Sequence, residues 1–191
     1  MNTQLAVVRP LAVTPAMLVS SSVPETDYPE WSAGTTYALG QRCIIAAQHK
    51  VYQSTADANT GNDPLATVSI KWVEVGPTNR WKPFDRSVST QVQQAGGVSY
   101  RITPGQAVTS VNLVNITGAT SVRVRIIEPG GATVYDATEH LARTPLEAGW
   151  WAWFFGGRRI PAQVLLQDLP SYPAADVLID GGVITAIGKD L

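Results

Sequence analysis

The sequence predicts a mainly β protein, built from a small three-stranded module and an antiparallel β-sandwich of the jelly-roll type. Short runs with alternating apolar and polar residues recur about every ten residues, as in sandwich folds. Glycine (16 residues) and proline (13 residues) are scattered between these runs as single turn signals. No strand pattern alternates with a long helical pattern, which excludes a parallel α/β sheet.

The composition of the chain favours protein partners over nucleic acid or a membrane. Of the 191 residues, 45% are hydrophobic and 15% are charged, and the net charge is −1. A typical charged share is about 25%, so we expect neighbouring subunits to cover part of the surface. Near neutrality gives no general attraction to nucleic acid. No apolar run is long enough to span a membrane, and the first residues lack the features of a secretory signal. We expect neither nucleic-acid binding nor membrane insertion.

Residues 1–30 contain four prolines, which exclude a long helix. Thr14 and Pro15 are suited to start one short helical turn. We expect an extended N-terminal arm that packs along the sandwich or onto another chain. On this hypothesis the rest of the chain folds without the arm but does not assemble.

Residues 31–78 form the predicted module, with strands at residues 40–46, 50–54 and 71–75. Its large rings are Trp31, Tyr37, Tyr52 and Trp72. In so short a segment these rings either build a minimal core or offer flat faces to a sugar. Both interpretations remain open, and the four rings are the candidate carbohydrate-binding residues.

Residues 79–88 are a predicted linker that carries two rings, Trp81 and Phe84. A linker with two large aromatic side chains is not expected to float freely. We expect both rings to anchor the module on the sandwich.

The sandwich is predicted over residues 89–191. Its clearest strand is 120–128, where Val122, Val124 and Ile126 alternate with Arg123 and Arg125. Other strands are expected at 108–116, 133–136, 160–168, 175–180 and 183–187, the last two separated by a turn at Gly181 and Gly182.

Residues 150–155 are almost all aromatic and would place rings on both faces of a strand. We expect core contacts on one face and a subunit or module contact on the other. A sugar-stacking platform is the alternative. The candidate interface residues here are Trp150, Trp151 and Trp153.

No catalytic signature is present. The only cysteine, Cys43, lies in a strand pattern and is expected to be buried. Together with His49 and His140 it cannot build a usual zinc site. Glycoside hydrolysis needs only two carboxylates, and 15 acidic residues always supply a pair, so that signal does not discriminate. We predict a non-enzymatic protein with no metal and no cofactor, and keep a cell-wall hydrolase as a distant alternative.

The spacing of Trp31, Thr36–Tyr37, Gly40, Val51–Tyr52, Pro64 and Trp72 resembles the small chitin-binding modules of bacterial chitinases and cellulases. The resemblance implies a short three-stranded sheet. Those modules place exposed rings just after the residue matching Tyr52, whereas residues 53–57 here contain none. We therefore expect weak or no chitin binding.

A second resemblance covers most of the chain. The chain resembles a group of bacteriophage and prophage tail proteins in four parts. These are the segment 25–31, the module, the segment 76–85 and a sandwich containing residues 134–136, 150–155 and 168–170. The segment Thr78-Asn79-Arg80-Trp81-Lys82, followed by Phe84-Asp85, is the most specific element. The resemblance implies a tail-tip or baseplate component.

On this basis we expect a chain made in the host cytoplasm and located in the virion tail. Its partners would be other tail proteins, in a homo-oligomeric ring or another multi-copy assembly, and host surface polysaccharide. The alternative is a receptor-binding lectin that stacks polysaccharide on its rings.

Overall fold

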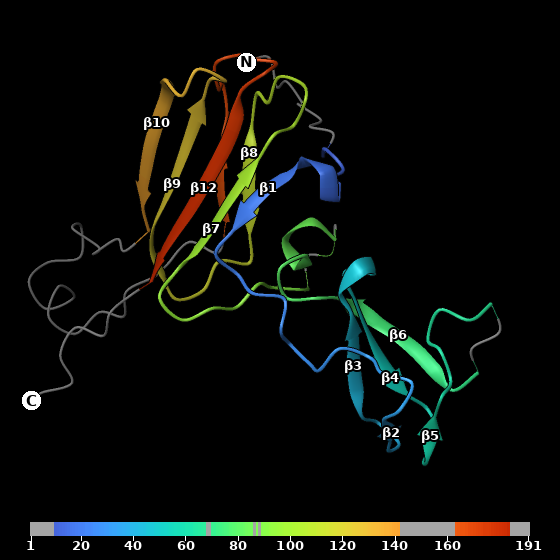
Figure 1. Cartoon of the computed structure of the whole chain (residues 1–191). Helices are drawn as coiled ribbons and strands as arrows, with labels where there is room; N and C mark the ends of the chain where they lie inside the picture. Colours follow the sequence, from blue (N-terminus) through green and yellow to red (C-terminus); the bar gives the residue numbers. More distant parts are fainter. Residues whose placement is uncertain (1–9, 68–69, 86, 88, 142–162, 184–191) are drawn as a thin grey trace, which may run out of the picture. The chain divides into compact units, whose positions relative to one another are not determined.

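The computed structural model describes residues 10–67, 70–85, 87, 89–141 and 163–183. The chain is mainly β, as predicted, and its helical segments in the described part are three short 3₁₀ turns. It divides into two compact units (Figure 1). Unit 1 comprises Met1–Ser22 and Gln94–Leu191, and unit 2 comprises Val23–Gln93.

Unit 1 contains a five-stranded antiparallel sheet in the order β1-β7-β12-β9-β10. A second antiparallel sheet consists of β8 and β11. The strands of the larger sheet are β1 (Leu18–Ser21), β7 (Val98–Ile102), β9 (Ala119–Ile127), β10 (Thr133–His140) and β12 (Asp176–Val183), and those of the smaller sheet are β8 (Val111–Val114) and β11 (Gln163–Leu166).

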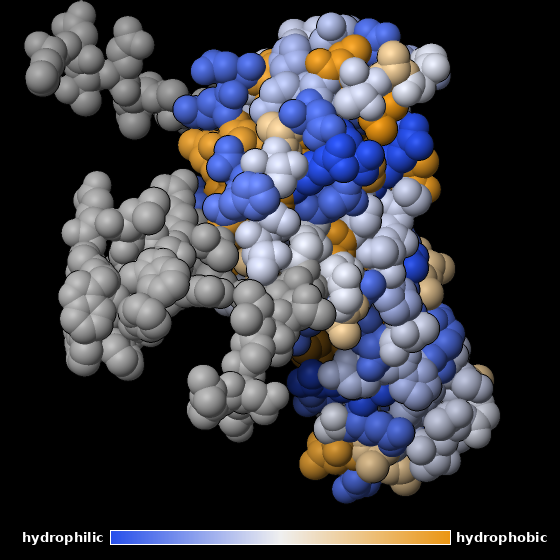
Figure 2. All heavy atoms as spheres, turned by 90° about the vertical axis from the view of Figure 1, so that its left-hand side faces the viewer, coloured by the Kyte–Doolittle hydropathy of each residue, from blue (hydrophilic) through white to orange (hydrophobic). Residues whose placement is uncertain are grey.

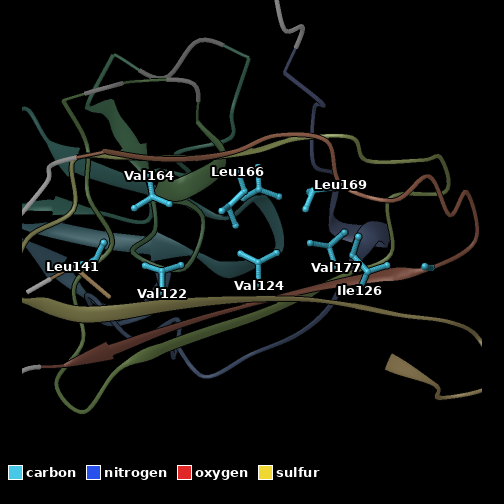
Figure 3. Close-up of a cluster of buried hydrophobic side chains, with 10 residues drawn as sticks. Val122, Val124, Ile126, Leu141, Val164, Leu166, Leu169 and Val177 are labelled. Atoms are coloured by element: carbon cyan, nitrogen blue, oxygen red, sulfur yellow. The ribbon is translucent and has the colours of Figure 1, made fainter. Parts of the chain in front are cut away.

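The core of unit 1 lies between these two sheets. Figure 3 shows Val164 and Leu166 of β11 pointing toward Val122 and Val124 of β9. Two antiparallel sheets that share an apolar core in this way form a sandwich. Among the described residues, the buried members of this core cluster are Val111, Val122, Val124, Ile126, Leu141, Val164, Leu166, Leu169, Ala175 and Val177.

The opposite face of the larger sheet is polar. Val122, Val124 and Ile126 are buried while Arg123 is exposed and Arg125 is half-buried, which confirms the alternation expected for this strand. Three Arg–Asp ion pairs join neighbouring strands: Arg101–Asp176 (2.6 Å), Arg123–Asp136 (2.5 Å) and Arg125–Asp180 (2.7 Å). Figure 2 views the molecule from the side of the edge strand β10. The visible part of this side carries mostly hydrophilic side chains, with separate apolar patches between them.

The expected turn at Gly181 and Gly182 is wrong, because both glycines lie inside the continuous strand β12. Gly181 pairs with Val98 on one side and Val122 on the other. A Cβ atom on Gly181 would lie 3.1 Å from Val98 Cγ2. Glycine therefore permits close strand packing at this point. Residues 184–187 of the expected following strand lie outside the described residues.

The residues of the expected N-terminal arm are divided between the two units. The expected helical turn is present as η1 (Pro15–Met17), with Thr14 at the N-cap position but without a side-chain cap. The next residues form β1, which pairs with β7 and belongs to unit 1. Residues from Val23 onward belong to unit 2, where Val23 is fully buried. Deleting residues 1–30 would therefore remove part of both units.

Unit 2 contains the three-stranded sheet expected for the module, in the order β3-β4-β6. Its strands are β3 (Arg42–Ile45), β4 (Lys50–Ser54) and β6 (Trp72–Pro77). A two-stranded sheet pairs β2 (Thr36–Tyr37) with β5 (Asn59–Thr60). Two 3₁₀ turns complete the unit, η2 (Ala46–Gln48) and η3 (Lys82–Phe84).

The residues expected to form a linker are part of unit 2, which extends to Gln93. Asn79 explains this, since its backbone N–H donates to Asp27 and its side-chain amide donates to the carbonyl of Gln93 (2.7 Å). The finer descriptions of the two units, as chitin-binding-like and jelly-roll-like, stay predictions.

Candidate functional site

The candidate carbohydrate-binding rings lie in the core of unit 2. Tyr37, Tyr52 and Trp72 are 3%, 7% and 6% exposed, and Trp31 packs against them while remaining partly exposed. The Tyr37 and Trp72 rings meet edge to face with their centroids 4.9 Å apart. This core contains none of the unit 1 core residues, in agreement with the expectation of two separate cores.

Hydrogen bonds fix two of these rings in place. Trp72 Nε1 donates to the carbonyl oxygen of Asn62 (2.8 Å), and the backbone N–H of Ser32 donates to the Tyr37 hydroxyl (2.8 Å). A buried Trp or Tyr normally satisfies its polar atom in this way. Rings held so deeply leave no open face for a sugar, so Tyr37, Tyr52 and Trp72 act as core residues.

The candidate residues taken from the sequence did not include a buried amide next to this core, that of Asn59. Asn59 is 1% exposed. Its Nδ2 donates to Ser54 Oγ (3.0 Å) and to the Lys71 carbonyl (3.1 Å), while its Oδ1 accepts from Asn62 (2.8 Å). The side chain thus joins β5 to β4 and to the residues before β6. The surrounding turn residues hid this role in the sequence.

The two candidate anchor rings also lie in unit 2. Trp81 is 8% exposed and stacks on His49 with ring centroids 4.4 Å apart. Phe84 meets Trp81 edge to face at 5.7 Å. Their expected anchoring of the module on the sandwich stays a prediction. Trp150, Trp151 and Trp153 lie outside the described residues.

A half-buried carboxylate organises the surroundings of Trp81. Glu25 Oε1 accepts hydrogen bonds from Thr78 Oγ1 (2.7 Å) and lies 2.9 Å from His49 Nδ1. Arg80 Nη1 lies 3.4 Å from Glu25 Oε2. The hydroxyl and the imidazole meet the same carboxylate oxygen rather than each other, so this arrangement does not activate Thr78 as a nucleophile. It ties the first residues of unit 2 to the segment after β6.

A separate cleft of about 450 Å³ opens on unit 2, away from the buried rings. Its charged lining side chains are Arg42, Lys82 and Asp27. The residues that line this cleft are scattered between positions 27 and 93, so no sequence motif predicts it. The full lining is Asp27, Tyr28, Arg42, Val51, Val75, Gly76, Pro77, Asn79, Lys82, Thr90 and Gln93.

Arg42 is the best-positioned cation of the cleft. It begins β3 and lies on the sheet face opposite the core residue Cys43. Arg42 Nε donates to Gln53 Oε1 (2.9 Å), and Nη1 donates to the Tyr28 hydroxyl (3.0 Å). The guanidinium carbon lies 5.7 Å from the Tyr28 ring centroid. These contacts hold the guanidinium and the Tyr28 side chain at the cleft in fixed positions.

Other features of the described residues offer no reactive centre. Cys43 is fully buried, and burial, aided by the negative charge of Glu30, raises the pKa of its thiol to about 11. The thiol is therefore protonated and unreactive near neutral pH. Within the described ranges, no cluster of His, Cys, Asp or Glu could hold a metal ion. No helix in that part of the chain is long and apolar enough to cross a membrane.

Comparison with known proteins found no matching family model and no curated protein with significant similarity.

Proposed function

We propose that this chain is a non-enzymatic structural component of a bacteriophage tail tip or baseplate. In this role it connects neighbouring tail proteins and presents unit 2 toward the host surface. The similarity of the segment Thr78-Asn79-Arg80-Trp81-Lys82, followed by Phe84-Asp85, to tail proteins supports the location.

One structural observation supports the connecting role. Each unit has its own core, yet each also exposes a pair of large apolar side chains on a single sheet, in addition to Val19 of β1 in unit 1. In unit 1 these are Val114 and Leu165, 43% and 47% exposed on the smaller sheet. In unit 2 they are Val73 and Val75, 47% and 45% exposed on β6. Apolar side chains grouped on a sheet surface are typical of protein contacts.

The alternative, a lectin that stacks polysaccharide on its rings, is less well supported. Tyr37, Tyr52 and Trp72 are buried in the core. We expect chitin beads to retain the full chain no better than they retain an unrelated protein. Strong, chitin-specific retention would favour the lectin instead.

Mass spectrometry of gradient-purified virions tests the location. We expect the chain to be present in a constant ratio to a known tail protein across the particle peak. Its absence from intact particles, despite expression in the infected cell, would contradict the proposal.

A complementation experiment tests the connecting role. Leu165→Ser should leave the fold intact, because the side chain points away from the core, but should reduce incorporation into tails. Leu39→Ser is the matched control, because Leu39 is 62% exposed but lies in a turn. Equal incorporation of the two variants would show that the smaller sheet of unit 1 is not a contact surface.

A further inference from the structure

We propose that the cleft of unit 2 binds a carboxylate-bearing saccharide, such as a hexuronate unit, through Arg42, Lys82 and Tyr28. This goes beyond the function proposed above, because it concerns a site separate from the aromatic core. It stands whether or not the chain is a tail component.

The charges of the cleft favour an anion. Two cations and one carboxylate line it, and Asp27 already accepts the backbone N–H of Asn79. Among the described residues, Lys82 Nζ forms no ion pair or hydrogen bond, and Arg42 Nη2 has no acceptor. Both groups are half-buried, so water screens them less than it screens cations that project fully into solvent.

A third donor lies beside Arg42. The Tyr28 hydroxyl accepts from Arg42, and no described residue accepts its own proton. Because a phenol both accepts and donates, this O–H remains able to bind a ligand oxygen. A guanidinium, an ammonium and a phenol among the lining side chains give the cleft several donors, and a carboxylate has only acceptors.

The rest of the cleft suits a sugar ring. Gln93 contributes a side-chain amide that matches sugar hydroxyls. The side chains of Asn79 and Thr90 also line the cleft, where they bond to Gln93 and Asp85 and add polar surface. Val75 and Pro77 contribute apolar surface for the C–H groups of a pyranose. Mixed apolar walls with a few convergent polar groups are typical of small-ligand sites, whose volumes are about 300–1,000 Å³.

An acidic peptide fits this surface less well. The usual way for a sheet to bind a peptide is to add a strand at an open edge. The β6 strand next to the cleft has an irregular register where Val51 pairs with Gly76, and it ends at Pro77, which has no N–H to donate. Bulges and prolines protect an edge from strand addition. A peptide could then use only its side chains.

Calorimetry on the full chain tests the proposal. The probe is trigalacturonate, and the matched control is its methyl ester, which keeps the rings but removes the charges. We expect the acid to bind, the ester to bind at least about tenfold more weakly, and added salt to weaken the acid's binding.

Two variants place the site. Lys82→Gln should weaken trigalacturonate binding about tenfold, the order expected for one charged hydrogen bond. Tyr28→Phe keeps the ring and should weaken binding by a factor of at least about three, since it removes a neutral donor and also the hydroxyl that holds Arg42 in place. Lys71→Gln is the control, because Lys71 belongs to unit 2 but does not line the cleft. Unchanged melting temperatures would show that all three variants are folded.

Several outcomes would overturn the proposal. Absence of trigalacturonate binding would do so, as would equal binding of acid and ester, or equal losses from Lys82→Gln and Lys71→Gln. Binding of a triglutamate peptide as tightly as trigalacturonate would assign the cleft to an acidic peptide instead. Failure to find the chain in virions would not affect any of these results, so the two proposals fail separately.

Discussion

The two units build stable β structure from different side chains. In the described part of the chain, the core cluster of unit 1 consists of ten buried aliphatic residues, and its strand β9 is nine residues long. Unit 2 has strands of at most six residues, and its core contains three aromatic rings. The buried polar side chains of the described residues all belong to unit 2: Ser54, Asn59 and Thr78.

The long strands of unit 1, β9, β10 and β12, contribute to this difference, because each has eight or nine residues. Long strands supply many backbone hydrogen bonds. Their side chains alternate between the two faces of the sheet, so the aliphatic ones fill the core and the ion pairs lie on the outer face. Short strands bury less surface per residue, and a small unit compensates with large rings. Side chains such as Asn59 then form hydrogen bonds between segments, in place of the backbone hydrogen bonds that longer paired strands would form. Unit 2 should therefore depend on few residues, each with a large effect.

The largest effect is expected from Trp72→Ala. Removal of a buried Trp typically costs about 3–5 kcal/mol, and here the hydrogen bond to Asn62 is also lost. Calorimetry of the full chain should show the unfolding of unit 2 shifted to a much lower temperature and that of unit 1 unchanged. Val73→Ala, at an exposed neighbour on the same strand, is the control. Similar shifts for both variants would contradict the aromatic-core account.

Leu166→Ala tests the aliphatic core of unit 1. A buried Leu→Ala change costs about 2–5 kcal/mol, and Leu166 is 9% exposed. Its neighbour Leu165 is 47% exposed, so Leu165→Ala should change stability by less than about 0.5 kcal/mol. Urea unfolding followed by circular dichroism measures both. A smaller loss for Leu166 than for Leu165 would place the core on the other face of β11.

Thr78→Val should have an intermediate effect on unit 2. The Thr78 hydroxyl is fully buried and donates to Glu25. Loss of a hydrogen bond to a charged group costs about 1.5–3 kcal/mol. Thr36→Val, which removes an exposed hydroxyl paired with Thr60, is the matched control in the same urea titration. If Thr78→Val costs no more than the control, the polar cross-links do not support unit 2.

The smallest effect concerns the exposed pair Arg123–Asp136. The hydrogen bond from Arg123 lowers the pKa of Asp136 below its ordinary value of 3.8. The pair therefore stabilises unit 1 fully when the pH is above 3.8, the ordinary pKa of the carboxyl group. This contribution to stability is lost as the pH falls through the lowered pKa. Urea unfolding of the parent and of Asp136→Asn over a pH series measures this. The small difference seen at neutral pH should disappear in acid and shrink with salt.

The sequence predicted regular elements best where alternation was strong. Residues 50–54 form β4 as expected, and the expected strand 120–128 is β9 shifted by one residue. It failed where partners distant in the sequence determine the structure. β1 carries only two aliphatic residues, Leu18 and Val19, and exists because β7 pairs with it. The glycine pair in β12 looked like a turn because close contact with Val98 is invisible in a local pattern.

The same limit applies to the site. The rings Tyr37, Tyr52 and Trp72 were visible in the sequence, but whether they face a core or a sugar depends on what covers them. The cleft depends on Tyr28, Arg42 and Lys82, which come from three separate segments. An arginine at the start of an apolar strand was the one available signal, since Arg42 precedes three buried residues.

The order of the strands along the chain has a consequence for synthesis on the ribosome. Unit 2 is one uninterrupted stretch, whereas unit 1 takes β1 from before it and its other strands from after it. The strand β12 lies at the centre of the larger sheet, although it is the last strand described. As the chain emerges, unit 2 is the first part whose contacts are all available. The strand pairs β1–β7 and β9–β10 cannot join into one sheet until β12 is synthesised and pairs with both β7 and β9. Nascent chains that stop before residue 176 should therefore carry a finished unit 2 and an open, aggregation-prone unit 1.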